Sequence, residues 1–82
     1  MTVDLLTPPA VADRLRRLAD LVREARIRDE ERRDAAAIRS TTRERHCAQL
    51  RDRAARLARG MIPELHALGY GDAADAEIRR LP

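Results

Sequence analysis

The chain has 82 residues, a formal net charge of +3 and 38% charged residues, so it forms one small domain at most. A domain of this size buries only a limited part of its surface. Large apolar side chains are scarce, because Phe and Trp are absent and Tyr70 is the one aromatic residue. These numbers exclude several domains, and we expect the chain to associate with a partner, first of all with a second copy of itself.

All 17 basic residues are arginine, and Lys and Asn are absent. This composition is typical of a high-GC genome, and selection against lysine modification is the alternative explanation. The positive surplus lies mainly in residues 41–60, which hold six Arg and two acidic residues. A local excess of this kind points to nucleic acid or an acidic protein as partner classes to consider.

A single cysteine, Cys47, excludes a disulfide within the chain and fits a reducing compartment. The sequence does not begin with a basic region followed by an apolar run, so we expect no signal peptide. No window approaches 18 apolar residues, so we expect no membrane span. The predicted location is the cytoplasm.

The first helix is predicted over residues 8–39, after a short lead-in of residues 1–7. Thr7 can cap this helix, and Pro8 suits the first helical position. Leu6 and Val11 have the spacing of a hydrophobic staple, which would fix the angle at which the chain enters the helix.

An apolar stripe runs along this helix at steps of four and three residues. Such a narrow stripe is typical of the seam of a coiled coil or a helical hairpin. Its members are Val11, Leu15, Leu18, Val22 and Ala25. Opposite charges at helical spacing are predicted to pair on the other faces, namely Asp13 with Arg17, Glu24 with Arg28, and Asp29 with Arg33.

The apolar stripe ends after Ala25, because the next two positions at the same spacing are Asp29 and Arg32. The nearest apolar residues, Ile27 and Ile38, lie roughly on the opposite face of the helix. Residues 28–34 are therefore expected either to project into solvent as a charged tip or to meet a partner on that other face.

The second helix is predicted over residues 42–59, after the weak helix formers Ser40-Thr41-Thr42. Thr41 followed by Glu44 matches a capping box. Gly60 and Pro63 end the helix. Its own apolar stripe consists of Cys47, Leu50, Ala54, Leu57 and Met61.

Two short helices are predicted after Pro63, over residues 63–68 and 73–80. Gly69 closes the first, and Asp72 can cap the second.

The predicted fold is all-α: a long antiparallel helical hairpin, coiled-coil-like, with two short C-terminal helices and an oligomeric, dimeric state. The alternative is one unbroken helix of about 52 residues, ~78 Å long, in place of the hairpin. Such a rod would expose both stripes unless it dimerised along its full length, so we favour the hairpin.

One face of the second helix is rich in arginine. Guanidinium groups suit phosphate, so this face is a candidate surface for nucleic acid or an acidic partner. A solvated, functionally neutral face is the alternative. The residues are Arg45, Arg53, Arg56 and Arg59.

No catalytic or metal site is expected. His46, Cys47 and His66 lack metal-ligand spacing, and Cys47 lies on the apolar stripe. The hydroxyl groups of residues 40–42 are predicted to serve the helix start, and the chain has no glycine-rich phosphate loop. The sequence therefore predicts neither an enzyme nor a cofactor.

The function predicted from these patterns is a small non-enzymatic protein–protein interaction module, an adaptor, inhibitor or regulator of the kind carried by a high-GC bacterium, its phages or its plasmids. The expected partners are a second copy of the chain and another protein, and membrane contact is not expected. The alternative is a DNA- or RNA-binding accessory protein that uses the arginine face. The predicted interaction seam comprises Val11, Leu15, Leu18, Val22, Leu50 and Leu57.

Overall fold

The computed structural model describes residues 8–82 and is all-helical over that range, which confirms the predicted all-α class. The lead-in, with the proposed Thr7 cap and Leu6 staple, lies outside the described residues. The four helices are α1 (Pro9–Ala37), α2 (Thr41–Gly60), α3 (Ile62–Ala67) and α4 (Gly71–Ile78).

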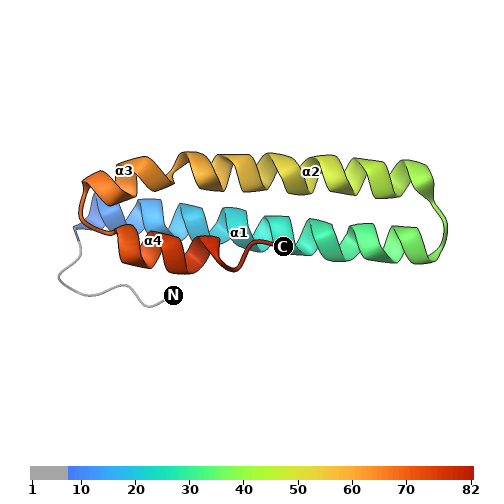
Figure 1. The fold of residues 1–82 in the computed structure, drawn as a ribbon, viewed down its shortest axis with the longest axis horizontal. Coiled ribbons are helices and arrows are strands. Elements are labelled where there is room, and N and C mark those ends of the chain that lie inside the picture. Colours follow the sequence, from blue (N-terminus) through green and yellow to red (C-terminus); the bar gives the residue numbers. More distant parts are fainter. Residues whose placement is uncertain (1–7) are drawn as a thin grey trace.

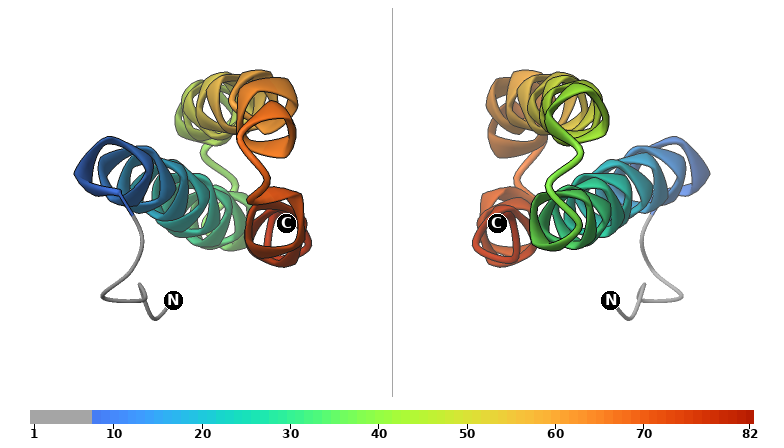
Figure 2. Two further views of the ribbon diagram at one scale, coloured as in Figure 1. Left: turned by 90° about the vertical axis from the view of Figure 1, so that its left-hand side faces the viewer. Right: turned by 90° about the vertical axis from the view of Figure 1, so that its right-hand side faces the viewer.

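The two long helices, α1 and α2, lie side by side and run in opposite directions (Figure 1). The short α3 continues α2 at its end, and α4 turns back to run alongside α1. Seen end-on, α4 lies on one side of the α1–α2 pair, and the three helices do not share a plane (Figure 2). The molecule measures 48 × 20 × 17 Å, so it is elongated along α1 and α2.

A Schellman turn at Ile38, Arg39 and Ser40 reverses the chain between the long helices. The Ser40 N–H donates to the Ala35 carbonyl at 2.9 Å, and the Arg39 N–H donates to the Ala36 carbonyl at 3.0 Å. Arg39 adopts a left-handed conformation with φ 58°. The two long helices are thus separate, and the unbroken rod is wrong.

The expected capping box at Thr41 and Glu44 is wrong. Ser40 is the N-cap residue of α2, and no side chain caps this helix start. The Glu44 N–H instead donates to the Ser40 carbonyl at 2.9 Å. The Glu44 carboxylate is directed to Arg32 of α1, so the sequence signature of a cap serves a contact between helices.

The C-terminal turn between α3 and α4 has the same Schellman geometry, with Gly69 at φ 86°. The predicted cap by Asp72 is wrong, because Tyr70 holds the N-cap position of α4 without a side-chain bond and Asp72 lies in the first turn. Both short helices also begin and end one or two residues before their predicted bounds.

The apolar core lies where all four helices meet, around the first half of α1. Leu18, Val22 and Leu65 are the largest fully buried side chains. Ala58 of α2 and Ala74 of α4 are also fully buried, and their small side chains let each of these two helices pack closely on the core. The core therefore supports one end of the α1–α2 pair, and the other end needs different contacts.

Candidate interaction surface

The predicted seam is divided by the structure. Val11, Leu15, Leu18 and Val22 are buried within the chain. Leu50 is half-buried, and Leu57 is 48% exposed. The seam residues of α1 therefore pack against other helices of the same chain. Of the predicted seam, only the two residues of α2 remain accessible to a partner.

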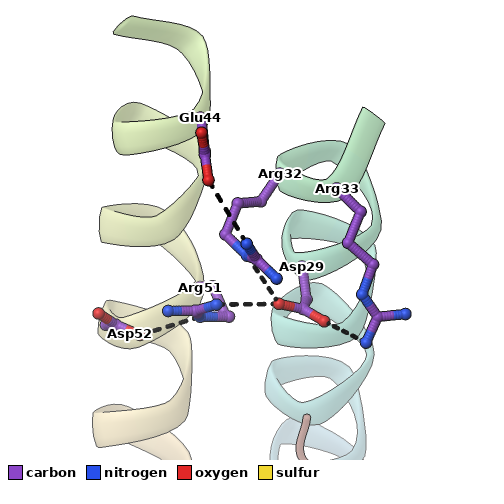
Figure 3. Close-up of polar contacts among 6 residues, drawn as sticks. All are labelled: Asp29, Arg32, Arg33, Glu44, Arg51 and Asp52. Atoms are coloured by element: carbon purple, nitrogen blue, oxygen red, sulfur yellow. Dashed lines mark hydrogen bonds and ion pairs between the residues drawn. The ribbon is translucent and has the colours of Figure 1, made fainter. Parts of the chain in front are cut away.

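Asp29 lies where the stripe of α1 was expected to fail, and it is buried against α2 (Figure 3). Arg51 of α2 donates to its Oδ1 at 2.9 Å. Arg32 and Arg33 of α1 complete its shell, at 3.1 Å to Oδ1 and 2.9 Å to Oδ2. The run 28–34 therefore does not simply project into solvent, because its seam-facing charges join the two helices.

These contacts set the ionisation of the cluster. The hydrogen bond from Arg51 is the largest influence on Asp29 and holds the pKa of its carboxyl below the ordinary value. Burial acts in the opposite direction, and Arg32 and Arg33 add to the lowering. The bonds to Asp29 and then to Asp52 raise the pKa of the Arg51 guanidinium.

Sequence reasoning missed this cluster, although it left a signal. Asp29 keeps the period of the apolar stripe, and Arg51 directly follows Leu50 on α2. A lone carboxylate in the seam would be costly, so an arginine from the facing helix is the natural partner. Around the pair, Arg32 also approaches Glu44 at 3.6 Å and Arg51 approaches Asp52 at 3.0 Å.

Opposite charges along α1 pair in a pattern that differs in part from the prediction. Asp29 pairs with Arg33 as expected. Asp13 pairs with Arg16 rather than Arg17, and Arg28 pairs with Glu31 rather than Glu24. Consequently neither Arg17 nor Glu24 has an ionic partner among residues 8–82.

An open groove of about 210 Å³ runs between α1 and α2. It is lined by three leucines and one alanine together with three charged residues. Arg17 and Glu24 lie on the face of α1 opposite to the residues that face α4. The groove is therefore on the side of the α1–α2 pair that α4 does not cover. The lining residues are Leu21, Leu50, Ala54, Leu57, Arg17, Glu24 and Arg53.

A larger hollow of about 420 Å³ lies on the other side, between α1 and α4. Its walls are mostly charged, and they include Arg26, Glu30 and the buried Glu77. Glu77 accepts a bond from Arg80 at 3.4 Å. Val22 and Ile27 contribute the larger apolar side chains of this lining.

The arginine face of α2 is exposed at all four predicted positions, Arg45, Arg53, Arg56 and Arg59. None of the four forms an ion pair within residues 8–82. Both acids of α2 are already engaged, Glu44 with Arg32 and Asp52 with Arg51. The face therefore presents positive charge that the described chain does not neutralise.

The thiol and imidazole groups have local contacts. Cys47 is buried, and its Sγ donates to Glu31 Oε2 at 3.9 Å. His66 Nε2 contacts Asp75 Oδ1 at 2.8 Å. Within residues 8–82 no three His, Cys, Asp or Glu side chains gather in a way that could hold a metal ion.

The chain matches no protein-family model, no curated protein and no solved structure. In the part of the chain that the structure describes, no helix combines the length and the apolar character needed to cross a membrane.

Proposed function

We propose that this chain is a small non-enzymatic helical interaction module that acts in the cytoplasm. It binds protein through the open groove, and it serves as an adaptor, inhibitor or regulator, as a homo-oligomer. The observation that carries the proposal is the exposure of Leu57 beside Leu50 in a groove that α4 leaves uncovered.

The chemistry of the groove supports a protein ligand. Burial of exposed leucine side chains by a partner removes apolar surface from water and so stabilises the complex. The flanking charges of Arg17, Glu24 and Arg53 give such a contact orientation and specificity. A helix laid into a groove between two helices is a common way in which proteins recognise one another.

The test is photo-crosslinking from position 57 in the cells that carry the chain. A photoreactive amino acid replaces Leu57, and a control chain carries it in place of Arg16. Arg16 is exposed and lies on the opposite side of α1 from the buried Leu18, so it faces away from the groove.

We expect protein adducts from position 57 that are absent from position 16, identified by mass spectrometry. An adduct with a second copy or with another protein supports the module. Equal labelling from both positions, or labelling of neither, contradicts it.

The second candidate function is binding to DNA or RNA through the arginine face. The observation that favours it is the absence of ionic partners for Arg45, Arg53, Arg56 and Arg59 among residues 8–82. Exposed guanidinium groups of this kind bind phosphate and release counterions.

This candidate predicts binding to a mixed-sequence duplex that falls steeply as salt is raised. It also predicts that Arg56→Glu weakens binding to all sequences alike. Arg23→Glu on α1 is a suitable control, since Arg23 is exposed but lies on another helix. A duplex that stays free at physiological salt contradicts the candidate.

A further inference from the structure

The contacts between α1 and α2 determine which residues lie at the same level of these antiparallel helices. Cys47 of α2 contacts Glu31 of α1. Ten residues from this contact toward the core, Leu57 lies near the level of Leu21, because both helices rise about 1.5 Å per residue. The two leucines line the open groove together, Leu21 as its buried floor and Leu57 with 48% of its surface exposed.

Two charged residues of the groove are level in the same way. Counted from the same contact, Arg53 of α2 lies within about one residue of the level of Glu24 on the facing wall of α1. Both side chains are exposed, and neither forms an ion pair within residues 8–82. The groove therefore has an acid on one wall and a base on the other, and each lacks an ionic partner.

This pattern is complementary to itself. A second copy turned by 180° about an axis parallel to the helices, with the two grooves face to face, places α1 over α2 of the second copy and α2 over α1. The rotation leaves every level unchanged. Glu24 then meets Arg53 of the second copy and Arg53 meets Glu24, so the contact occurs twice, as an isologous interface requires.

The leucines supply the centre of such an interface. Leu21 and Leu57 of the two copies form one layer of four leucines around the axis. Leu50, seven residues from Leu57, approaches Leu50 of the second copy across the axis and forms a second layer. Each long helix is then antiparallel to both of its neighbours, as in an up-and-down four-helix bundle.

We propose that a second copy of this chain occupies the open groove in this parallel-axis arrangement, with Glu24 paired with Arg53 across the interface and Leu57 in a shared layer with Leu21. The inference rests on the proposed function, because the groove must first be an interface.

The charges of the groove favour this occupant. A carboxylate or guanidinium that is covered without a partner is costly, and the second copy brings a group of opposite sign to both Glu24 and Arg53. Arg17, the remaining charged residue of the groove, lies near the level of Met61, where α2 ends. Arg17 is exposed, so its long side chain can keep the guanidinium in water.

The other two-fold orientation has its axis across the helices, at the leucine layer, and fits less well. It reverses the levels, so that Leu50 lies opposite Glu64 of the second copy and an apolar side chain faces a charge. Glu24 then meets Arg17, and Arg53 is left without a carboxylate. The two orientations therefore predict different partners for Glu24.

The available area is sufficient. Stable interfaces bury about 800 Å² per partner. The molecule is 48 Å long and 20 Å across, and a parallel axis lets the two copies overlap along their full length.

The test is a charge exchange followed by mixing. Arg53→Glu gives a chain with two glutamates at the paired positions, and Glu24→Arg gives a chain with two arginines. Each variant alone opposes like charges twice across the interface, so we expect the dimer dissociation constant to rise at least about tenfold. In an equimolar mixture every pair is again opposite in charge, so a heterodimer of wild-type strength should form.

Sedimentation equilibrium measures the dissociation constants, and native mass spectrometry identifies the heterodimer. Glu24→Arg/Arg53→Glu in one chain should restore the homodimer. Arg17→Glu reverses a charge in the same groove and is the matched control: it should leave the homodimer nearly unchanged, and it should not rescue Glu24→Arg on mixing. Circular dichroism verifies that each variant remains helical.

Thiol crosslinking provides a second measurement in a Cys47→Ala chain. A short bismaleimide should join Leu50→Cys to the same position of the second copy, because the two lie at one level across the axis. The transverse orientation separates these positions by about 21 Å along the helices, so no crosslink would form there. Arg16→Cys, which faces away from the groove, is the control and should not crosslink.

A monomeric wild-type chain overturns the second copy as occupant. A mixture of Arg53→Glu and Glu24→Arg that forms no heterodimer, or rescue of Glu24→Arg by Arg17→Glu, overturns the proposed arrangement. In each case an adduct between position 57 and a protein would leave the proposed function intact. A Leu57 position that labels nothing removes both.

Discussion

Asp29 is a buried carboxylate at a position whose spacing along α1 matches the apolar stripe. Its partners are Arg51 of α2 and the neighbouring Arg32 and Arg33 (Figure 3). The core of large apolar side chains lies at the other end of the α1–α2 pair. The cluster therefore holds the helices together at the level where α1 lacks apolar residues.

Asp29→Asn should lower the free energy of unfolding by about 1–3 kcal/mol, because Arg51 loses its carboxylate while remaining half-buried. Urea unfolding with an unchanged m-value measures this loss. Asp20→Asn is the matched control: Asp20 forms an exposed pair with Arg23, worth at most about 1 kcal/mol.

Replacing both charges, as in Asp29→Leu/Arg51→Met, should restore most of that stability, because no unpaired charge is left between the helices. If the double variant is less stable than Asp29→Asn, the attraction between the two charges holds the helices together, and avoiding an unpaired charge is not sufficient.

The same carboxyl gives stability a defined pH dependence. Its pKa is lower in the folded chain than the ordinary value of about 3.9 in the unfolded chain. Its stabilising contribution is therefore fully present above about pH 5 and is lost progressively as the pH falls through the unfolded and then the folded pKa. Urea midpoints measured from pH 7 down to pH 2 should fall more steeply for the wild type than for Asp29→Asn, and parallel curves would contradict this origin.

At the scale of the elements, two turns of one geometry differ in the residue at the left-handed position. Gly69 follows α3 at φ 86°, and Arg39 follows α1 at φ 58°. A residue with a Cβ is strained in this conformation, whereas glycine is not.

Arg39→Gly should accordingly stabilise the chain by about 0.5–1 kcal/mol, and Gly69→Ala should destabilise it by about 1–2 kcal/mol. Thermal unfolding followed by circular dichroism measures both changes. Arg39→Ala keeps the strain and removes only the exposed side chain, so its effect should be close to zero. A destabilised Arg39→Gly would mean that the Arg39 side chain stabilises the turn.

The helices and their buried faces could be predicted because their signals are local. The period of Leu15, Leu18 and Val22 identifies a buried stripe whatever covers it. The break before α2 is indicated by the weak helix formers Ser40-Thr41-Thr42. The left-handed turn residue, Arg39, carries no such signal, because glycine is the residue typical of that position. The contact between Asp29 and Arg51 depends on the register of two helices, which neither helix specifies alone.

At the scale of the whole molecule, the exposure of Leu57 could not be predicted from the sequence. Its spacing matches that of a seam residue, yet it is 48% exposed. The reason is the position of α4, which runs along one side of the α1–α2 pair (Figure 2). Within residues 8–82, α4 covers one of the two sides and the other side stays open, which is where we propose that a partner binds.

The most direct test of this account is sedimentation velocity of the wild type and of Leu57→Asp, each mixed with a labelled mixed-sequence duplex at physiological salt. The account predicts that the wild type sediments with twice the mass of one chain and Leu57→Asp with the mass of one chain, while the duplex stays free in both samples. A wild-type chain that sediments alone and carries the duplex with it, unchanged by Leu57→Asp, would contradict the account and assign the function to the arginine face.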